Sequence, residues 1–189
     1  MTRAPERIVH GDLVIRRWRR TDALAQATAV RESLDHLRPW MPWAATEPLP
    51  VEERRAMLAR AERAWAAGDE YSYGLFLGRV VVGAGSLVRR IGPGGVEIGY
   101  WVHVDHLRRG YATLLAGTLT DVAFGLPDIT HVEIHHDLAN LASGRVPPKL
   151  GFVVIGDEPD EVAAPGEVGM SRIWRMTRAA WPARRPPDL

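Results

Sequence analysis

The sequence contains no cysteine, which excludes disulfide bonds, cysteine-ligated zinc and an acyl-enzyme formed on a thiol. Lysine is nearly absent too, because Lys149 is the one lysine among 24 basic residues. No apolar run is long enough to cross a bilayer, and the N-terminus lacks the apolar core of a signal peptide, so we expect no membrane contact and a cytoplasmic location. A formal net charge of +1 gives no reason to expect a nucleic-acid partner.

The 189 residues are enough for one domain with a substantial core. Hydrophobic periodicity predicts helices over 21–33, 51–67, 110–124 and 140–151, and strands over 13–18, 71–77, 80–88, 96–104, 129–135, 152–155 and 171–177. We therefore predict an α/β (α+β) fold with a mixed, mostly antiparallel sheet and helices on both faces. The domain should cover residues 1–178, and the proline- and arginine-rich residues 179–189 should form a flexible tail.

The clearest chemical signal is a predicted strand that runs through a basic turn into a helix. Arg108 and Arg109 precede Gly110, and the helix begins directly after this glycine. Unpaired N–H groups at the helix start, the helix dipole and the arginine forks all favour a phosphate group. The turn therefore indicates a nucleotide-tailed cofactor, although a surface turn with two solvated arginines has the same sequence. No Gly-x4-Gly-Lys-Ser/Thr loop is present.

A second block extends from Asn140 to Phe152. Together with the first block it resembles the GCN5-related N-acetyltransferase (GNAT) family, and within it the Rim-type branch of ribosomal-protein N-terminal acetyltransferases. The resemblance is carried by residues 97–101 (Glu-Ile-Gly-Tyr-Trp), 109–113 (Arg-Gly-Tyr-Ala-Thr), Asn140 with Ser143, 149–152 (Lys-Leu-Gly-Phe) and the tryptophan loop 37–43. It spans nearly the whole domain, from Leu13 to about Thr177.

This resemblance implies acetyl-coenzyme A as co-substrate and no metal. The pantetheine arm of the coenzyme would lie in a splay between the fourth and fifth predicted strands, 96–104 and 129–135. There it would pair with Val102 and Val104. The pyrophosphate would be held by Arg108, Arg109, Gly110, Tyr111, Ala112 and Thr113. Leu107 stands where the family often has Gln or Arg, so the pyrophosphate should be held less by side chains and more by backbone N–H groups. Asn140 is expected to cap a helix and to bind the pantetheine chain, and capping alone is equally compatible with the sequence.

Acyl transfer to an amine needs a proton acceptor for the amine and a proton donor for the leaving thiolate. Strand alternation puts Glu97 on one face with Gly99 and Trp101, and the resemblance favours Glu97 as the catalytic base, directly or through water. The competing interpretation is a carboxylate paired with an arginine. Ser143 is the candidate acid, because the tyrosine that many relatives carry four residues later is Pro147 here. Ser143 could alternatively serve only to cap a helical turn.

Trp40, Trp43 and Trp101 are the candidate acceptor-binding residues, and the two loop tryptophans could instead cap the core. His135 and His136 are adjacent on a strand and point to opposite faces, which argues against a shared metal ion.

The predicted function is acetyl transfer from acetyl-CoA to a primary amine, such as a protein N-terminus, within a ternary complex. Two alternatives stay open: an acyltransferase for a small-molecule amine or a longer donor such as succinyl-CoA, and a non-catalytic coenzyme sensor. Relatives often pair, so a homodimer is also an option.

Overall fold

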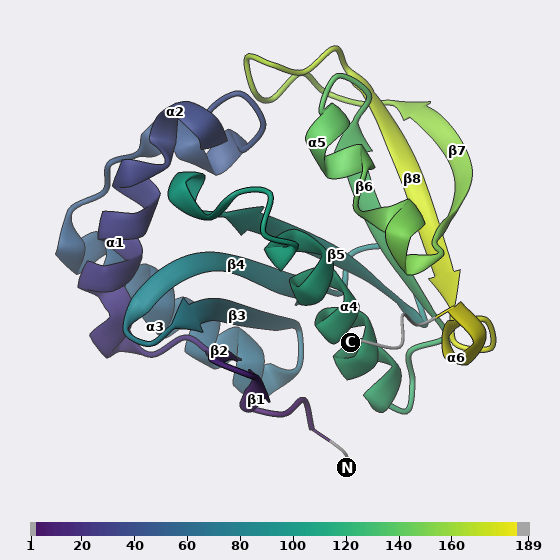
Figure 1. Ribbon diagram of the computed structural model, residues 1–189, viewed down its shortest axis with the longest axis horizontal. Coiled ribbons are helices and arrows are strands. Elements are labelled where there is room, and N and C mark those ends of the chain that lie inside the picture. Colours follow the sequence, from purple (N-terminus) through teal and green to yellow (C-terminus); the bar gives the residue numbers. More distant parts are fainter. Residues whose placement is uncertain (1–2, 185–189) are drawn as a thin grey trace.

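The computed structural model describes residues 3–184, which form an eight-stranded sheet flanked by helices (Figure 1). The strand order across the sheet is β1-β2-β3-β4-β5-β6-β8-β7. The strands are β1 (Arg7–His10), β2 (Leu13–Arg17), β3 (Glu70–Leu77), β4 (Val80–Val88), β5 (Gly95–Val102), β6 (His131–Asp137), β7 (Val153–Pro159) and β8 (Met170–Thr177). Every pairing between them is antiparallel except the parallel pair β5–β6. The predicted mixed, mostly antiparallel sheet is confirmed.

Helical segments connect the strands. The α-helices are α1 (Ala23–Glu32), α2 (Leu34–Leu37), α3 (Val51–Ala67), α4 (Tyr111–Gly125), α5 (Leu141–Gly144) and α6 (Trp181–Arg184). Short 3-10 turns are η1 (Arg20–Asp22), η2 (Pro42–Thr46), η3 (Val104–His106) and η4 (Pro147–Leu150). None of the helices within residues 3–184 is both long and apolar enough to cross a membrane.

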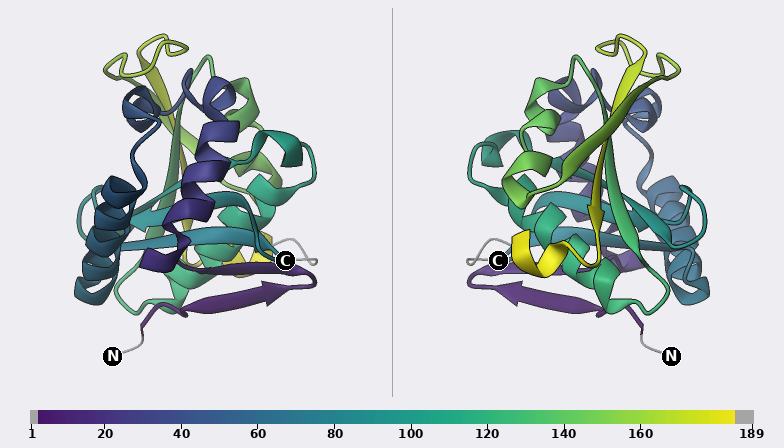
Figure 2. Two further views of the ribbon diagram at one scale, coloured as in Figure 1. Left: turned by 90° about the vertical axis from the view of Figure 1, so that its left-hand side faces the viewer. Right: turned by 90° about the vertical axis from the view of Figure 1, so that its right-hand side faces the viewer.

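The hydrophobic core is divided between the two faces of the sheet. Successive residues of β3 illustrate the division, because Leu75 belongs to the cluster under α4 and Phe76 to the cluster under α1 and α3. On the α4 side, Leu115 and Leu119 are completely buried. On the other side, Leu58 of α3 packs in one cluster with Phe76. Helices therefore cover both faces, as predicted, and Figure 2 shows α3 and α4 on opposite sides of the strands.

Three parts of the chain differ from the sequence prediction. The helix predicted over 140–151 is divided into α5 and η4. The first strand is β1, a four-residue edge strand that forms a hairpin with β2 through Gly11. Its length and partial exposure leave too weak a pattern to detect. Within the predicted tail, the short helix α6 forms, and its Trp181 is 5% exposed and donates a 2.8 Å hydrogen bond from Nε1 to Asp121. Residues 185–189 of that tail lie outside the described residues.

The sheet opens between its two halves. Strands β5 and β6 pair over only three residues each, from Gly95 opposite His131 to Glu97 opposite Glu133. Beyond this point β5 continues to Val102 and β6 to Asp137 without pairing to each other, and Figure 1 shows them diverging. The splay predicted between these strands is thus present, and it leaves backbone groups of β5 without a strand partner on that side.

Candidate active site

Three adjoining cavities lie along the splay between β5 and β6, and together they form one channel through the molecule. The mouth cavity lies at the start of α4, the middle cavity lies along β5, and the acidic cavity lies between the tryptophan loop and β6. The mouth and middle cavities share Val102, Leu107, Ala112 and Val146. The middle and acidic cavities share Trp40, Tyr100, Asn140 and Ser143. A long ligand can therefore extend from the mouth to the edge of the acidic cavity.

The mouth cavity contains the predicted phosphate turn. Arg108 and Gly110 both adopt a left-handed backbone, with φ of 59° and 80°, so the turn directs successive N–H groups toward one side. Gly110 is the N-cap of the 15-residue helix α4, and no side chain caps that helix end. A Cβ at Gly110 would meet no protein atom within 4 Å, and Gly110 itself lines the mouth cavity. Helix N–H groups and dipole thus face the mouth, as phosphate binding requires.

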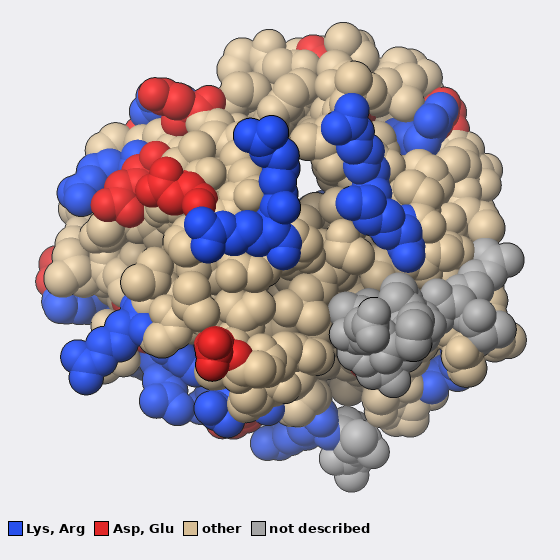
Figure 3. Space-filling view, viewed as in Figure 1, with Lys and Arg blue, Asp and Glu red and all other residues tan. Residues whose placement is uncertain are grey.

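Basic side chains border this mouth on both sides. The cavity is lined by Arg108 from the turn and by Arg145 and Lys149 from the α5–η4 segment. Figure 3 shows basic side chains on either side of a hollow near the centre of this face. Lys149 belongs to the motif that carried the resemblance, whereas Arg145 was not predicted from the sequence. Leu107 lines both the mouth and the middle cavity, so this departure from the family pattern supplies an apolar wall.

The predicted coenzyme residues Val102 and Val104 lie in different surroundings. Val102 is the last residue of β5 and lines the middle and mouth cavities. Val104 lies beyond the strand in η3, and its N–H donates to Ser33 Oγ at 3.1 Å. The backbone donor of Val104 is thus already in use. His103, between them, is also bound internally, because its Nε2 lies 3.0 Å from Glu32 Oε2 and its Nδ1 accepts from the Asp105 N–H.

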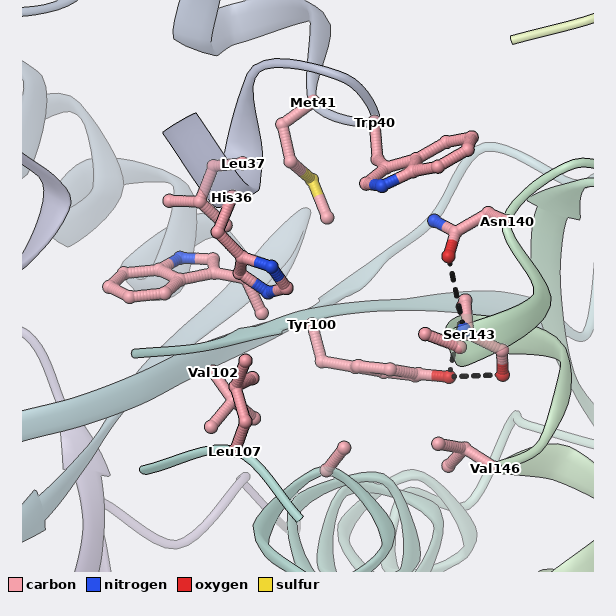
Figure 4. Close-up of a pocket in the computed structure, with 13 residues that line it drawn as sticks. His36, Leu37, Trp40, Met41, Tyr100, Val102, Leu107, Asn140, Ser143 and Val146 are labelled. Carbon is pink, nitrogen blue, oxygen red and sulfur yellow. Dashed lines mark hydrogen bonds between the residues drawn. The ribbon is translucent and has the colours of Figure 1, made fainter. Parts of the chain in front are cut away.

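Two hydroxyl groups meet where the middle and acidic cavities join (Figure 4). The Tyr100 hydroxyl lies 3.2 Å from Ser143 Oγ and 3.3 Å from the Ser143 carbonyl oxygen. Asn140 accepts the Ser143 N–H at 3.1 Å and caps α5. Asn140 capping is therefore observed, and the –NH2 of its amide stays available to a ligand. Tyr100 comes from β5 and Ser143 from α5, so the splay brings together residues 43 positions apart.

Tyr100 is the functional candidate that the sequence analysis missed. Burial raises the pKa of its hydroxyl to about 12, and the hydrogen bond to Ser143 only partly offsets this. The hydroxyl is therefore protonated at neutral pH and can donate a hydrogen bond. The expected slot for a tyrosine, residue 147, holds a buried proline. The position of Tyr100 within the 97–101 motif was the available signal, but its contact with Ser143 depends on the tertiary structure.

The acidic cavity is bordered by the two loops expected to shape an acceptor pocket. Trp40 and Trp43 line it, and Trp101 lies in the middle cavity with its ring 6.4 Å from that of Trp43. The loop before β8 contacts the tryptophan loop, because the Gly166 N–H donates to the Pro39 carbonyl at 2.9 Å. A Cβ at Gly166 would lie 2.6 Å from that oxygen, so only glycine allows this approach. The carboxylates of Asp160, Glu161 and Glu167 line the same cavity.

Glu97 lies at the base of the acidic cavity and is 7% exposed. Arg90 grips both of its carboxylate oxygens, with Nε donating to Oε2 at 2.7 Å. The hydrogen bond to Glu97 is the main reason that the pKa of Arg90 is raised. Glu97 is thus paired with an arginine, as the competing interpretation expects. It also lines the acidic cavity, as a catalytic base must.

Comparison with known proteins agrees with this geometry. Residues 12–153 match the family model described as an acetyltransferase (GNAT) domain, whereas no curated protein sequence matches the chain. The ribosomal L7/L12 α-N-protein acetyltransferase RimL in complex with coenzyme A superposes with a TM-score of 0.82, at 19% identity over 90% of this chain and 96% of RimL.

Two further solved structures have the same fold. The ribosomal-protein-S5-alanine acetyltransferase from Vibrio fischeri has a TM-score of 0.80, at 16% identity over 93% of this chain and 98% of its own. The microcin C7 self-immunity acetyltransferase MccE, in complex with acetyl-CoA and AMP, has a TM-score of 0.83 at 14% identity over the same shares of the two chains. These structural superpositions establish the fold, while the family match establishes the activity class. The chain belongs to the GNAT acetyltransferase family, whose enzymes transfer an acetyl group from acetyl-CoA to an amine.

Proposed function

We propose that this enzyme acetylates a protein N-terminal α-amine by direct transfer in a ternary complex with acetyl-CoA. The observation that carries the proposal is the continuous channel, which has a basic mouth at one end and an acidic cavity at the other. An anionic coenzyme and a cationic amine are attracted to opposite ends. With no cysteine in the chain, a thiol-bound acyl intermediate is excluded, and both substrates can meet at Tyr100 and Ser143.

The coenzyme half of the site follows from the mouth and middle cavities. The backbone N–H groups from Arg108 to Thr113 bind the pyrophosphate, assisted by Arg108, Arg109 and Lys149. The pantetheine arm then follows the free edge of β5 past Val102 and reaches the amide of Asn140. The apolar walls that Leu107, Ala112 and Val146 present suit the arm's methylene groups. Binding at the free strand edge would be β-augmentation by a ligand amide.

The chemistry requires two proton movements. The amine nitrogen attacks the thioester carbonyl carbon, the carbon–sulfur bond breaks, and the amine loses one proton to a base in the acidic cavity. The thiolate takes a proton from the Ser143 hydroxyl, which lies 3.2 Å from the Tyr100 hydroxyl. Glu97, together with the polar residues beside it, forms the amine-facing wall. Holding amine and thioester together supplies ~7–11 kcal/mol, and one acid or base supplies ~10²–10⁴-fold in rate.

The choice of a protein acceptor has two supports. RimL is named as an α-N-protein acetyltransferase of ribosomal L7/L12 and the Vibrio fischeri enzyme as an acetyltransferase of ribosomal protein S5, and this chain shares their fold. Trp40 and Trp43 also give the acidic cavity a broad aromatic wall, which suits several peptide residues. Such a substrate would place the enzyme in the cytoplasm. The second candidate acceptor is a small-molecule amine, favoured by the likeness to MccE, whose structure holds AMP beside acetyl-CoA.

The proposal is tested by steady-state release of coenzyme A thiol. Acetyl-CoA is supplied with hexapeptides that begin with Ser, Ala or Met, and the same peptides with blocked N-termini are the controls. We expect turnover with free N-termini only, and mass spectrometry should place one acetyl group on the α-nitrogen. Turnover of small-molecule amines alone would move the assignment to the second candidate. Preference for succinyl-CoA would revise the donor, and tight coenzyme binding without any turnover would indicate a sensor.

A further inference from the structure

A cluster of charged residues occupies the point where β5 and β6 separate. Glu97 and Glu133 are opposite each other in the last paired position, and both are buried. Arg90 binds Glu97, while Arg175 and His135 bind Glu133. His135 is two residues further along β6, so it is on the same face as Glu133 and lines the acidic cavity.

We propose that Nδ1 of His135 is the atom that takes the proton from the acceptor amine, and that Glu133 is its positioning residue. The inference rests on the proposed function, because it names the base in the same site. It also assigns a role to a histidine that the sequence analysis considered only as a metal ligand and rejected.

The hydrogen bonds determine which nitrogen of His135 carries the proton. The His135 Nε2 atom lies 2.7 Å from Glu133 Oε2. Hydrogen bonds from His135 and Arg175 outweigh burial and lower the pKa of Glu133, so its carboxylate is ionised and can only accept. Nε2 must therefore be the donor, which leaves the lone pair on Nδ1. Among residues 3–184 no hydrogen-bond donor contacts Nδ1, and the Glu97 carboxylate, with Oε2 3.9 Å away, is beyond hydrogen-bond distance, so this lone pair is free.

The surroundings favour a positive charge on His135 once it has accepted a proton. Glu133 of β6 touches one ring nitrogen and Glu97 of β5 lies near the other. Two arginines also border the cluster, Arg90 before β5 and Arg175 on β8, and each is paired with one of these carboxylates. The remaining charged groups of the acidic cavity are the carboxylates Asp137, Asp160, Glu161 and Glu167. An imidazolium therefore forms in a mainly anionic environment.

Other groups in the cavity are less suited to take the proton. Both oxygens of Glu97 are engaged by Arg90, so protonating Glu97 would disrupt that ion pair. His136 has both ring nitrogens in use, because Nδ1 donates to the Asp137 carbonyl at 2.8 Å and Nε2 accepts from Trp174 Nε1 at 3.0 Å. Burial is the main cause that lowers the pKa of His136. Of the cavity groups, His135 alone combines an anchored ring with a free lone pair.

The proton balance of the step is complete. The neutral amine attacks the thioester, and the proton that its nitrogen loses passes to His135 Nδ1. Ser143 protonates the leaving thiolate. After the products leave, His135 releases its proton to solvent, and Ser143 regains one through the channel. No further reactant is required.

The first test measures the tautomer in the free enzyme and needs no acceptor. Nitrogen-15 NMR of the imidazole groups, assigned by the signal that disappears in His135→Gln, should show a protonated Nε2 and an unprotonated Nδ1 at pH 8. The Glu133→Gln variant should show a mixture of tautomers, because its amide can accept or donate. A proton on Nδ1 in the wild-type enzyme would overturn the inference whatever the enzyme acetylates.

The second test uses the peptide turned over fastest by the wild-type enzyme. On the acid side of the pH profile, the logarithm of kcat/KM should rise with a slope near 2, because the peptide amine (reference pKa ~7.7–8.0) and the proposed base must both be unprotonated for the attack. In His135→Gln the slope should fall to 1, and the rate at pH 7.5 should fall about 10²-fold. Glu133→Gln should lose kcat with little change in KM.

The matched control is His131→Gln, which removes an imidazole from the same face of β6 but outside the acidic cavity, where His131 lies beside Thr130. It should keep the slope of 2. Coenzyme A affinity and the midpoint of thermal unfolding verify that each variant is folded. A His135→Gln enzyme that is folded and keeps both the slope and the rate would refute the role of His135. A wild-type enzyme inactive with every peptide would instead refute the proposed function.

Discussion

Two neighbouring arginines of α3 make ion pairs in opposite surroundings, which allows burial to be tested directly. Arg54 pairs with Glu47, and each side chain is 2% exposed. Arg55 pairs with Glu52, and these side chains are 53% and 78% exposed. We predict that Arg54→Ala lowers the free energy of unfolding by ~3–5 kcal/mol, whereas Arg55→Ala lowers it by ~0.5 kcal/mol or less.

The large value for Arg54 comes from what the substitution leaves behind. Without Arg54, the Leu49 N–H, which donates at 2.8 Å, is the one partner that residues 3–184 leave to the buried Glu47 carboxylate. A buried charge without its counter-ion is costly, while a solvent-exposed carboxylate such as Glu52 is solvated by water. Glu47 also anchors the tryptophan loop, because its carbonyl oxygen accepts from Arg38 at 3.1 Å. The acceptor KM of Arg54→Ala should therefore rise as well.

The assay is urea unfolding followed by tryptophan fluorescence at pH 7.5, with both variants measured beside the wild type. A difference of 3 kcal/mol between the two variants corresponds to roughly a 150-fold change in the unfolding equilibrium, since ~1.4 kcal/mol is tenfold. If the two variants lost the same free energy of unfolding, within about 0.5 kcal/mol, the reasoning would be refuted. Burial, rather than the ion pair itself, would then not determine how much stability is lost.

Three further predictions concern the active site. Gly110 lines the mouth and has a positive φ that a valine rarely adopts, so in Gly110→Val calorimetry should show acetyl-CoA affinity lowered at least about tenfold with the circular dichroism unchanged. Wild-type affinity in this variant would argue against the phosphate cradle. Tyr100→Phe keeps the ring and loses the hydroxyl beside Ser143, so kcat should fall by ~10²-fold while acetyl-CoA affinity holds, and an unchanged kcat would exclude a role for Tyr100. Burial raises the pKa of Glu133, but hydrogen bonds from His135 and Arg175 outweigh it and lower the pKa overall. The stability that Glu133 contributes is thus complete above its unfolded pKa of ~4.3 and is lost as pH falls through the lower folded value, so Glu133→Gln should flatten the acid side of urea-unfolding curves.

The conformation of the turn before α4 was predictable because its features are local. A strand, a basic turn, Gly110 and a helix start follow one another within about 20 residues, and each has its own sequence signal. The observed left-handed φ at Gly110 and the uncapped start of α4 agree with that prediction. The sequence could not reveal that Arg108 also adopts a left-handed conformation, because an arginine seldom does so.

The proposed transfer point was only partly predictable. Sequence reasoning found Ser143 and Glu97 but treated each separately, with a helix cap or an arginine pair as the alternative. Both alternatives concern contacts within a few residues, and Arg90 does pair with Glu97. The contact between Tyr100 and Ser143 spans 43 residues, and no local pattern encodes it. Edge strand β1 was missed for a related reason, since its pairing with β2 stabilises it more than its own short pattern.

By itself, the sequence determined the mixed sheet with its flanking helices, the glycine turn before α4 and the family, because periodicity, glycine conformation and helix starts are properties of neighbouring residues. Only the tertiary structure decided which side chains meet where chemistry occurs. Strands β5 and β6 separate after Glu97 and Glu133, and that separation sets how Tyr100 approaches Ser143 and how His135 lies between two carboxylates. Distances of this kind depend on the packing of both halves of the sheet, which no single segment of the chain specifies.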